Sequence, residues 1–394
     1  ISPSVKSPIL VLALSTASAV IGMTLITPSI PLIKNEFNVS SDLVQLVLTF
    51  YLIFVSLGQI VFGSLSDRYG RRPLILFGSI LYMLGGILSI FSNSLSFLIL
   101  CRIIQALGAA ACMSIARVIV NDSFSKNEAA SKLSIITAVM VIFPQVGLIL
   151  GGFITEFFGW KGTMTILFIF GSFLFIGIYF FIPETLLKKK LNLSLSLVFK
   201  SYYSVITDKL FFNFTLISAL QSGIFFSFFS FLPYEFFRIG LSPLTFGIWF
   251  SFVGIGYFIG NIANGFYAKK LGINIMCLSG CIISCISLIC MFLFSYLNYN
   301  SPIFISIPFL FFGFGNGITV ANSIIGALSN TGSNAGAATG LAGAMQMAAG
   351  GVLGSFIITM GGDDSFLVAM IIVIILSFIA VYNSVLIMRY KSEK

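Results

Sequence analysis

The sequence predicts an all-α membrane protein that crosses the bilayer twelve times. Of its 394 residues, 58% are hydrophobic and only 8% are charged, and the mean hydropathy is +1.08. A soluble domain of this length would expose far more charge, so most of the surface must face lipid. The apolar residues also fall into runs of about 20, which is the length that a helix needs to span the hydrocarbon core.

Twelve apolar runs follow one another along the chain. They cover residues 9–32, 43–64, 74–93, 96–120, 133–154, 163–182, 210–233, 244–267, 273–295, 302–325, 337–360 and 366–388. Several runs contain Gly or Pro, which spanning helices tolerate when neighbouring helices satisfy the freed backbone groups. The longest polar connection, residues 183–209, separates six runs from six. We therefore expect two pseudo-symmetric six-helix bundles, residues 1–182 and 210–394, joined by this linker.

The distribution of Lys and Arg predicts the orientation. If the amino terminus is cytoplasmic and the runs alternate, only Lys34, Lys161 and Arg238 fall in outer loops, and the other loop Lys and Arg residues fall inside. This positive-inside bias predicts that the linker and both termini are cytoplasmic. It also accounts for the net charge of +9 without a nucleic-acid partner.

Three cysteines, Cys277, Cys281 and Cys285, share one helix face at four-residue spacing. Such a face invites a comparison with soft-metal sites, but the chain has no His and no carboxylate lies near them. We interpret these cysteines as small packing residues, and we expect neither a metal nor a cofactor.

The most specific motif joins the second and third runs. It reads Gly63-Ser-Leu-Ser-Asp67-Arg68-Tyr-Gly70-Arg71-Arg72-Pro73, and a weaker copy, Gly265-Phe-Tyr-Ala-Lys269-Lys270-Leu-Gly272, follows the second run of the other half. The motif resembles the loop signature of the major facilitator superfamily, the twelve-helix secondary transporters. Gly63 permits close approach of another helix. Asp67 is expected to face the amino-terminal end of the eleventh helix. The resemblance implies that this signature loop latches the two halves in the outward-facing state.

Two further motifs lie in the fourth and fifth runs. Arg102-Ile-Ile-Gln105-Ala-Leu-Gly resembles the helix-four signature of proton-coupled drug antiporters, whose Arg faces the central cavity. The alternative for Arg102 is a side chain that reaches back to the outer interface. Pro144, Gly147, Gly151 and Gly152 look like the antiporter signature, although Phe143 stands where that family has Gly. We expect these small residues to form a flat face against the other bundle, and ordinary Gly and Pro enrichment is the alternative.

Two further stretches resemble the bicyclomycin and chloramphenicol resistance subfamily of the drug/proton antiporters. They are Ala116-Arg117-Val-Ile-Val-Asn-Asp122 and the segment 231–243, which contains Glu235. That subfamily usually carries an acidic residue in helix one, where this chain has Thr24. No acid lies in mid-membrane, so proton coupling must involve Arg102 or an interfacial acid (Glu235, Asp122 or Asp67), or it is absent.

The residues that line the central cavity are predicted only from their depth within the spans. The mid-depth polar residues are Thr24, Thr27, Arg102, Gln105, Gln221, Asn316 and Gln346, and the aromatic candidates are Phe225, Phe226, Trp249 and Tyr257. A mostly apolar pocket with few polar anchors suits amphipathic small molecules. For each aromatic residue, packing or a lipid-facing position is the alternative.

These observations and the resemblance imply a monomeric exporter of small amphipathic compounds in a bacterial-type inner membrane. It would work by alternating access with protons as the coupling ion. One alternative is transport of an endogenous metabolite, a siderophore or an organic anion, with Arg102 holding a carboxylate. A membrane-embedded enzyme is disfavoured, because the chain lacks paired carboxylates and any nucleophile beside a base at membrane depth. A receptor or scaffold on the same fold is a third possibility.

Overall fold

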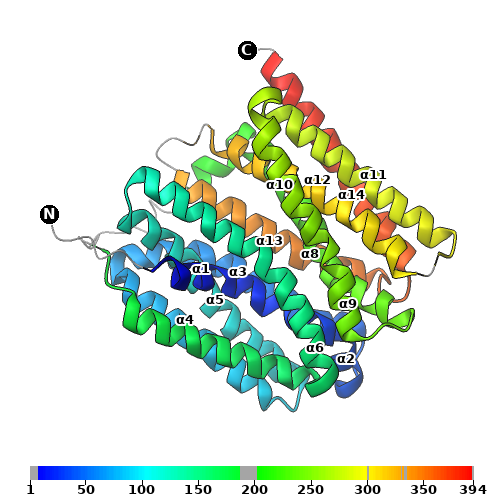
Figure 1. Ribbon diagram of the computed structural model, residues 1–394, viewed down its shortest axis with the longest axis horizontal. Helices are drawn as coiled ribbons and strands as arrows, with labels where there is room; N and C mark the ends of the chain where they lie inside the picture. The colour runs from blue at the N-terminus through cyan, green and yellow to red at the C-terminus, as the bar shows by residue number, and fades with distance from the viewer. Residues whose placement is uncertain (1–7, 187–201, 300, 330, 332–334, 393–394) are drawn as a thin grey trace.

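The computed structural model describes residues 8–186, 202–299, 301–329, 331 and 335–392, and within these ranges the chain is helical (Figure 1). The first half contains α1 (Ile9–Thr24), the 3-10 turn η1 (Thr27–Ser29), α2 (Ile30–Phe37), α3 (Ser41–Tyr69), α4 (Arg71–Ile90), α5 (Leu95–Ser123) and α6 (Lys126–Phe181). The second half contains α8 (Lys209–Arg238), α9 (Pro243–Phe250), α10 (Phe252–Leu271), α11 (Ile273–Tyr296), α12 (Pro302–Leu328), α13 (Ala335–Thr359) and α14 (Phe366–Ser392). Most of the predicted linker, residues 187–201, lies outside the described residues, together with four of the lysines that predicted the orientation.

Helix α6 is two antiparallel spans rather than one. Gly159 interrupts it with φ +68° and ψ −178°, a left-handed conformation that favours glycine. Just after Gly159, the indole nitrogen of Trp160 donates to Glu36 on α2 at 2.5 Å, whereas Gly177 lies beside Val11 near the start of α1. The chain therefore reverses at Gly159, and we call residues 126–158 the fifth span and residues 160–181 the sixth span.

This reversal reconciles the structure with the twelve predicted spans. Within the described residues, eleven helices are long and apolar enough to cross a membrane, and one of them, Ile142–Phe181, has 40 residues. A 40-residue helix would be about 60 Å long, twice the thickness of the hydrocarbon core. That segment therefore holds two of the predicted runs.

The helices form two bundles. Helices α1, α3, α4, α5 and α6 pack against one another, and α8 packs with α12, α13 and α14, while α11 bridges α12 and α14. The blue-to-green first half and the yellow-to-red second half lie on opposite sides of Figure 1, with the orange α13 beside the first half. The bundles meet along α3 with α13 and along the fifth span with α9.

The second bundle depends on close backbone approach between α10 and α12. A Cβ on Gly256 would overlap the carbonyl oxygen of Leu310, and a Cβ on Gly313 would overlap that of Val253. Small residues at such crossings let helices approach within backbone contact, which is the main source of helix association in lipid. These glycines therefore fix the crossing of α10 and α12.

The two bundles touch over only part of their length. We call the end that carries the signature loop the basic end, and the end that carries Lys34 and Asp363 the opposite end. Inter-bundle contacts run from the opposite end past the middle of α3, as far as Gln59. They include the hydrogen bonds Gln45 to Ser230 at 2.7 Å, Ser56 to the Ala344 carbonyl at 2.8 Å, Gln59 to the Met347 sulfur at 3.3 Å and the Leu244 amide to Glu156 at 3.2 Å, and the ion pair Lys34–Asp363 at 3.9 Å.

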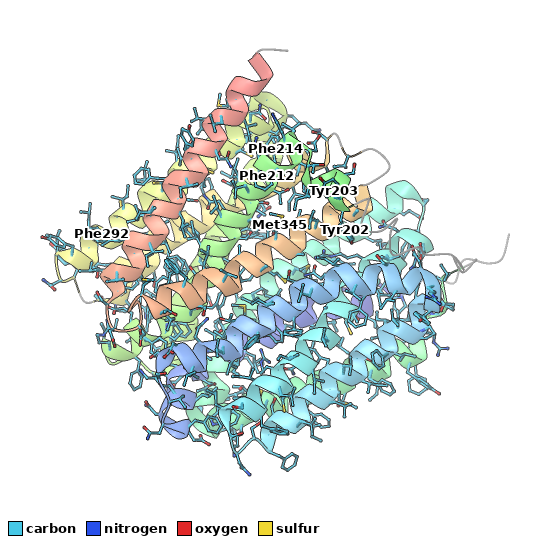
Figure 2. All side chains as sticks on the ribbon, turned by 180° about the vertical axis from the view of Figure 1, so that it is seen from behind. Tyr202, Tyr203, Phe212, Phe214, Phe292 and Met345 are labelled. Carbon is cyan, nitrogen blue, oxygen red and sulfur yellow. The ribbon has the colours of Figure 1, made fainter. Side chains whose placement is uncertain are left out.

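At the basic end, space is open beside two equivalent glycines. Apart from the backbone of its own helix, no described atom lies within 4 Å of the position that a Cβ would take on Gly63, and the same holds for its counterpart Gly265. The predicted close approach at Gly63 is therefore not made in this conformation. Tyr202, from the helical residues 202–206, lies near Gly340 of α13, and burial raises its pKa while a hydrogen bond with Ser64 of α3 opposes that rise. Figure 2 labels Tyr202 near α13 and Met345.

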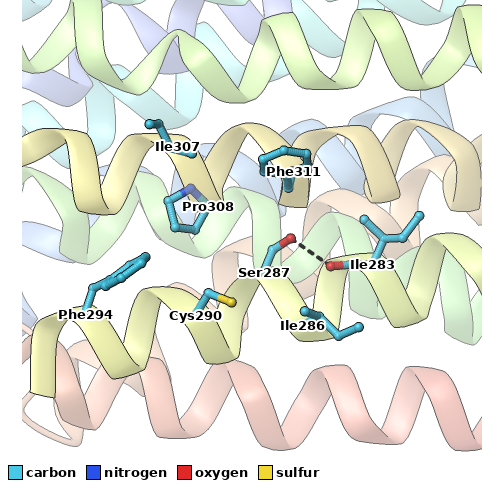
Figure 3. Close-up of a pocket in the computed structure, with 8 residues that line it drawn as sticks. All are labelled: Ile283, Ile286, Ser287, Cys290, Phe294, Ile307, Pro308 and Phe311. Carbon is cyan, nitrogen blue, oxygen red and sulfur yellow. Dashed lines mark hydrogen bonds between the residues drawn. The ribbon is translucent and has the colours of Figure 1, made fainter.

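A groove of about 330 Å³ opens on the outer surface between α11 and α12 (Figure 3). Pro308 lies within α12, where it lacks an amide hydrogen and disturbs the regular helix. The hydroxyl of Ser287, which lines the groove, donates to Ile283 within α11 at 2.7 Å. Because the groove presents almost only hydrocarbon to a ligand, we do not place the substrate there.

Candidate functional site

The side chain of Arg102 occupies the interior of the first bundle. It is fully buried on α5, a helix whose first turn is capped by the Ser94 hydroxyl. One terminal nitrogen donates to the carbonyl of Gly22 on α1 at 2.6 Å, and the other donates to the amide oxygen of Gln105. The guanidinium carbon lies 4.0 Å from the ring centroid of Tyr51 on α3. This cation–π contact partly compensates a charge that has been removed from water.

The surroundings of Arg102 supply donors rather than acids. Its Nε, the amide nitrogen of Gln105 and the hydroxyl of Tyr82 have no hydrogen-bond partner among the described residues. The Tyr51 hydroxyl donates to the Ala19 carbonyl at 2.9 Å. No described carboxylate lies within ion-pair distance of Arg102. The cluster therefore carries an excess of positive charge, which would attract an anionic group.

Arg102 does not face the space between the bundles in this conformation. The resemblance implied an arginine directed toward the central cavity, whereas α1, α3 and α5 enclose this one completely. Gln105 is buried beside it. The two tyrosines that complete the cluster, Tyr51 and Tyr82, were not among the predicted site residues, because a tyrosine inside an apolar run cannot be told from a packing aromatic by sequence.

Thr24 marks the point where α1 ends before a break set by Pro28 and Pro31. Its hydroxyl has no hydrogen-bond partner and points at Gly147 of the fifth span, where a Cβ would overlap it. Thr27 instead donates to the carbonyl of Met23 at 3.0 Å. Thr24 is thus a free polar group at the contact between α1 and the fifth span.

The small residues of the fifth span have two roles. Gly147 and Gly151 pack against Thr24 and Leu25 of their own bundle, whereas Gly152 packs against Pro243 of α9 in the other bundle. The prediction that all of these glycines meet the other bundle is therefore wrong for Gly147 and Gly151. A helix presents residues 147 and 151 on one side and 152 about 100° further round, so only the last reaches α9.

The predicted residues of the second bundle fall into separate places. Asn316 donates to the backbone carbonyl of Gln221 at 2.8 Å, and the buried Gln221 side chain has no nitrogen or oxygen partner among the described residues. Trp249 stacks on Phe252 with centroids 5.3 Å apart, and Phe225 packs edge-on against Phe226 at the same separation. Gln346 is partly exposed on α13. No described hydrogen bond joins these residues to Arg102, so each bundle carries its own half of the candidate site.

The charges of the signature loop gather around Arg71. Its guanidinium pairs with Asp67 at 2.6 Å and with Asp122 of α5 at 3.0 Å, and it donates to the Ser66 hydroxyl at 2.6 Å. Only 5% of Arg71 is exposed. The pair with Asp122 joins the loop to the segment 116–122, so the loop helps to hold the first bundle together at the basic end.

Glu184 anchors the other side of this loop. Its carboxylate accepts the backbone amides of Arg71 at 3.0 Å and Arg72 at 3.3 Å, at the start of α4, where the helix dipole favours a negative group. Gly70 has φ +107°, and a Cβ on it would come within 2.5 Å of the Glu184 carboxylate. Arg68, by contrast, is exposed and lies over the ring of Tyr69.

The three acids predicted for proton coupling are all paired with arginine. Asp67 and Asp122 share Arg71 at the basic end, and Glu235 pairs with Arg238 at the opposite end. Each of the three carboxylates therefore has a guanidinium partner in this conformation.

Removing the Arg71 side chain is expected to destabilise the protein. In Arg71→Ala, the carboxylates of Asp67 and Asp122 lose their shared cation and repel each other. Because both carboxylates are about a quarter exposed, water screens part of this effect, and we expect a loss of about 2 kcal/mol. Thermal unfolding of the purified protein measures the loss. The exposed neighbour variant Arg68→Ala should stay within about 0.5 kcal/mol of the wild type, and equal losses in the two variants would contradict the assignment.

Comparisons with known proteins agree with this architecture. The family model described as Major Facilitator Superfamily matches residues 12–355. The chain is 26% identical over 347 residues to a "Bicyclomycin resistance protein homolog" of Haemophilus influenzae, covering 87% of each chain. It is 30% identical over 254 residues to a "Chloramphenicol resistance protein" of Pseudomonas aeruginosa, covering 64% of this chain and 60% of that protein. An "Uncharacterized transporter" of Rickettsia bellii is 29% identical, and the match spans 62% of its length.

Solved structures share the fold at low identity. A bacterial homologue of the lysosomal transporter Spinster, solved in an inward-facing and unoccupied conformation, superposes with a TM-score of 0.76 at 16% identity, over 96% of this chain and 95% of that one. A D-xylose–proton symporter gives the same TM-score at 15% identity, over 96% and 95%. The predicted twelve-helix fold is therefore confirmed. The chain is an integral membrane protein that belongs to the major facilitator superfamily of transporters.

Proposed function

We propose that this protein exports small amphipathic compounds across a bacterial inner membrane by alternating access, in exchange for protons. The observation that carries the proposal is the arrangement of the two bundles, whose described contacts run from the opposite end to Gln59 while space is open beside Gly63 and Gly265 at the basic end. The excess of Lys and Arg at the basic end supports a cytoplasmic position for that end and for both termini. The conformation is then inward-facing, and the path is open to cytoplasmic ligands.

Drug efflux is supported by the relatives named for bicyclomycin and chloramphenicol resistance. The apolar and aromatic lining around Phe225 and Trp249 suits such compounds, and Arg102, Gln105, Gln221, Asn316 and Gln346 supply the few polar anchors. Access to the buried Arg102 requires α1 to move, and the break after Thr24 gives α1 a place to bend. We expect the transporter to act as a monomer, with its apolar outer surface in contact with lipid.

Proton coupling has to use the interfacial acids, because Thr24 replaces the helix-one acid. In this proposal Glu235 lies at the outer end, where protons enter, and Asp67 and Asp122 lie at the inner end, where protons leave. Opening the opposite end would break the Lys34–Asp363 ion pair between the bundles, and the Asp363 carbonyl accepts from Arg238, the partner of Glu235. Proton binding would thereby be linked to the conformational change.

The experiment is flux of radiolabelled chloramphenicol into proteoliposomes under an imposed pH gradient. We expect the drug to move opposite to the proton flux, so that its direction reverses with the gradient. The drug flux should collapse when a protonophore is added. Liposomes without protein provide the baseline. Drug flux that ignores the gradient would refute antiport.

Transport of an organic anion is the second candidate, and one specific observation favours it. The Arg102 cluster presents donors without a described carboxylate, so a substrate carboxylate would complete it. The same proteoliposomes distinguish the candidates, because an organic acid such as citrate would then move down its own gradient while chloramphenicol would not.

A further inference from the structure

A second arginine lies within the membrane on α5, and nothing in the proposed mechanism uses it. Arg117 follows Arg102 by 15 residues, which is about 22 Å along the helix axis. It precedes the end of α5 at Ser123 by six residues, or about 9 Å. Unlike Arg102, it is not fully buried. An ionisable side chain at membrane depth marks a functional site by default.

Among the described residues, Arg117 has one weak hydrogen-bond partner. Its described hydrogen bond runs from a terminal nitrogen to the thioether sulfur of Met140 at 3.3 Å, and sulfur is a weak acceptor. The nearest acids along the chain and in the signature loop, Asp122 and Asp67, are engaged by Arg71. Among the described residues no carboxylate lies within 4 Å of Arg117. A guanidinium has five donors in a fixed fork, so the contact with Met140 leaves donors that the described residues do not occupy.

The position of Arg117 fits entry from the basic end. Its partner Met140 belongs to the fifth span, one helical turn before Pro144, so Arg117 lies between α5 and that span. Along α5, Arg117 lies nearer than Arg102 to the basic end, where space is open beside Gly63 and Gly265. A ligand that enters from that end would reach the depth of Arg117 before that of the buried Arg102 cluster.

We propose that Arg117 binds the anionic group of an amphipathic ligand that enters from the basic end. The group is a carboxylate, sulfonate or phosphate on an apolar scaffold, because a guanidinium recognises such groups with two parallel hydrogen bonds. This inference rests on the proposed transport path for its direction of entry, but the binding site itself is independent of coupling.

The test compares two dyes that share a xanthene ring system and differ in charge. Fluorescein is anionic and rhodamine 6G is cationic, and fluorescence anisotropy measures their binding to the full chain in phosphatidylcholine nanodiscs. We expect Arg117→Gln to weaken fluorescein binding about tenfold, the loss of one charge-assisted interaction. Rhodamine 6G binding should not weaken. Arg117→Lys, which keeps the charge, should retain part of the fluorescein affinity.

Two controls separate the site from its surroundings. Arg68→Gln removes an exposed charge from the signature loop and should leave the affinity for both dyes unchanged. Met140→Leu removes the thioether partner, keeps Arg117, and should leave fluorescein affinity within about twofold of the wild type. It also keeps the proposal testable if Arg117→Gln does not fold, since a tenfold loss in Met140→Leu would show that packing and not charge determines binding.

A lipid arm distinguishes the two sources of an anionic group. If phosphatidylglycerol in the nanodisc weakens fluorescein binding to the wild type but not to Arg117→Gln, the site takes a lipid headgroup. If it has no effect, the site takes a translocated ligand, and both results support an anion site. The proposal is overturned if fluorescein does not bind the wild type, or if Arg117→Gln changes neither dye or weakens both equally. Because no gradient or flux enters this measurement, a failure of drug–proton exchange would leave its result intact.

Discussion

Gly256→Ala is expected to destabilise the protein by about 3 kcal/mol or more, the largest effect of any single methyl group considered in this structure. The new Cβ would overlap the Leu310 carbonyl oxygen, which belongs to the backbone of α12 and cannot rotate away. Relief requires α10 and α12 to separate, and overpacking of this kind costs up to about 3 kcal/mol or occasionally more. The melting temperature of the purified protein, followed by thiol-reactive fluorescence as the cysteines become exposed, measures the loss.

Gly265→Ala is the matched control for this prediction, since it adds the same methyl group to the same helix. No atom lies within 4 Å of its Cβ position, so its melting temperature should equal that of the wild type or rise slightly. If both variants melt together, the crossing of α10 and α12 is not set by glycine.

Arg102→Ala is expected to lower transport by about tenfold to a hundredfold while the protein remains folded. The variant loses a charge-assisted anchor worth about 1.5–3 kcal/mol. It also removes a desolvated charge that no described carboxylate neutralises. This removal offsets part of the stability that the variant loses in packing. Flux in the proteoliposome assay measures the first effect, and the melting temperature measures the second.

Tyr51 provides the comparison for the Arg102 prediction. Tyr51→Phe keeps the ring beneath the guanidinium and loses only the hydrogen bond to Ala19, so transport should fall less than threefold, roughly the effect of one neutral hydrogen bond. Tyr51→Leu removes the ring and should approach Arg102→Ala. Wild-type flux in Arg102→Ala would show that this arginine has no part in transport.

Most of the fold could be predicted from the sequence, because the bilayer imposes one length and one composition on every span. The details that failed depend on local geometry. The run 9–32 was predicted as continuous, but Pro28 and Pro31 divide it into α1, η1 and α2. Helix α3 extends to Tyr69, beyond the predicted 43–64, since its last turns carry polar residues past the hydrocarbon core.

The candidate site was harder to predict, because the depth of a residue can be read from sequence and its direction cannot. Arg102 was correctly singled out as a cation in the fourth span, but only the packing of α1 against α5 shows that it points into its own bundle. Asp122 meets Arg71 across 51 positions of the chain, a contact that no local pattern reveals. Tyr51 carried no signal at all among so many aromatic residues.

Gly63 and Gly265 have a consequence for how the molecule changes shape. They occupy equivalent places in the two repeats, and beside each of them there is room that no described atom fills. A rocking movement could bring a neighbouring backbone into either place without reorganising the interior of a bundle. The room that such a movement needs at these two glycines is therefore already present in the observed conformation.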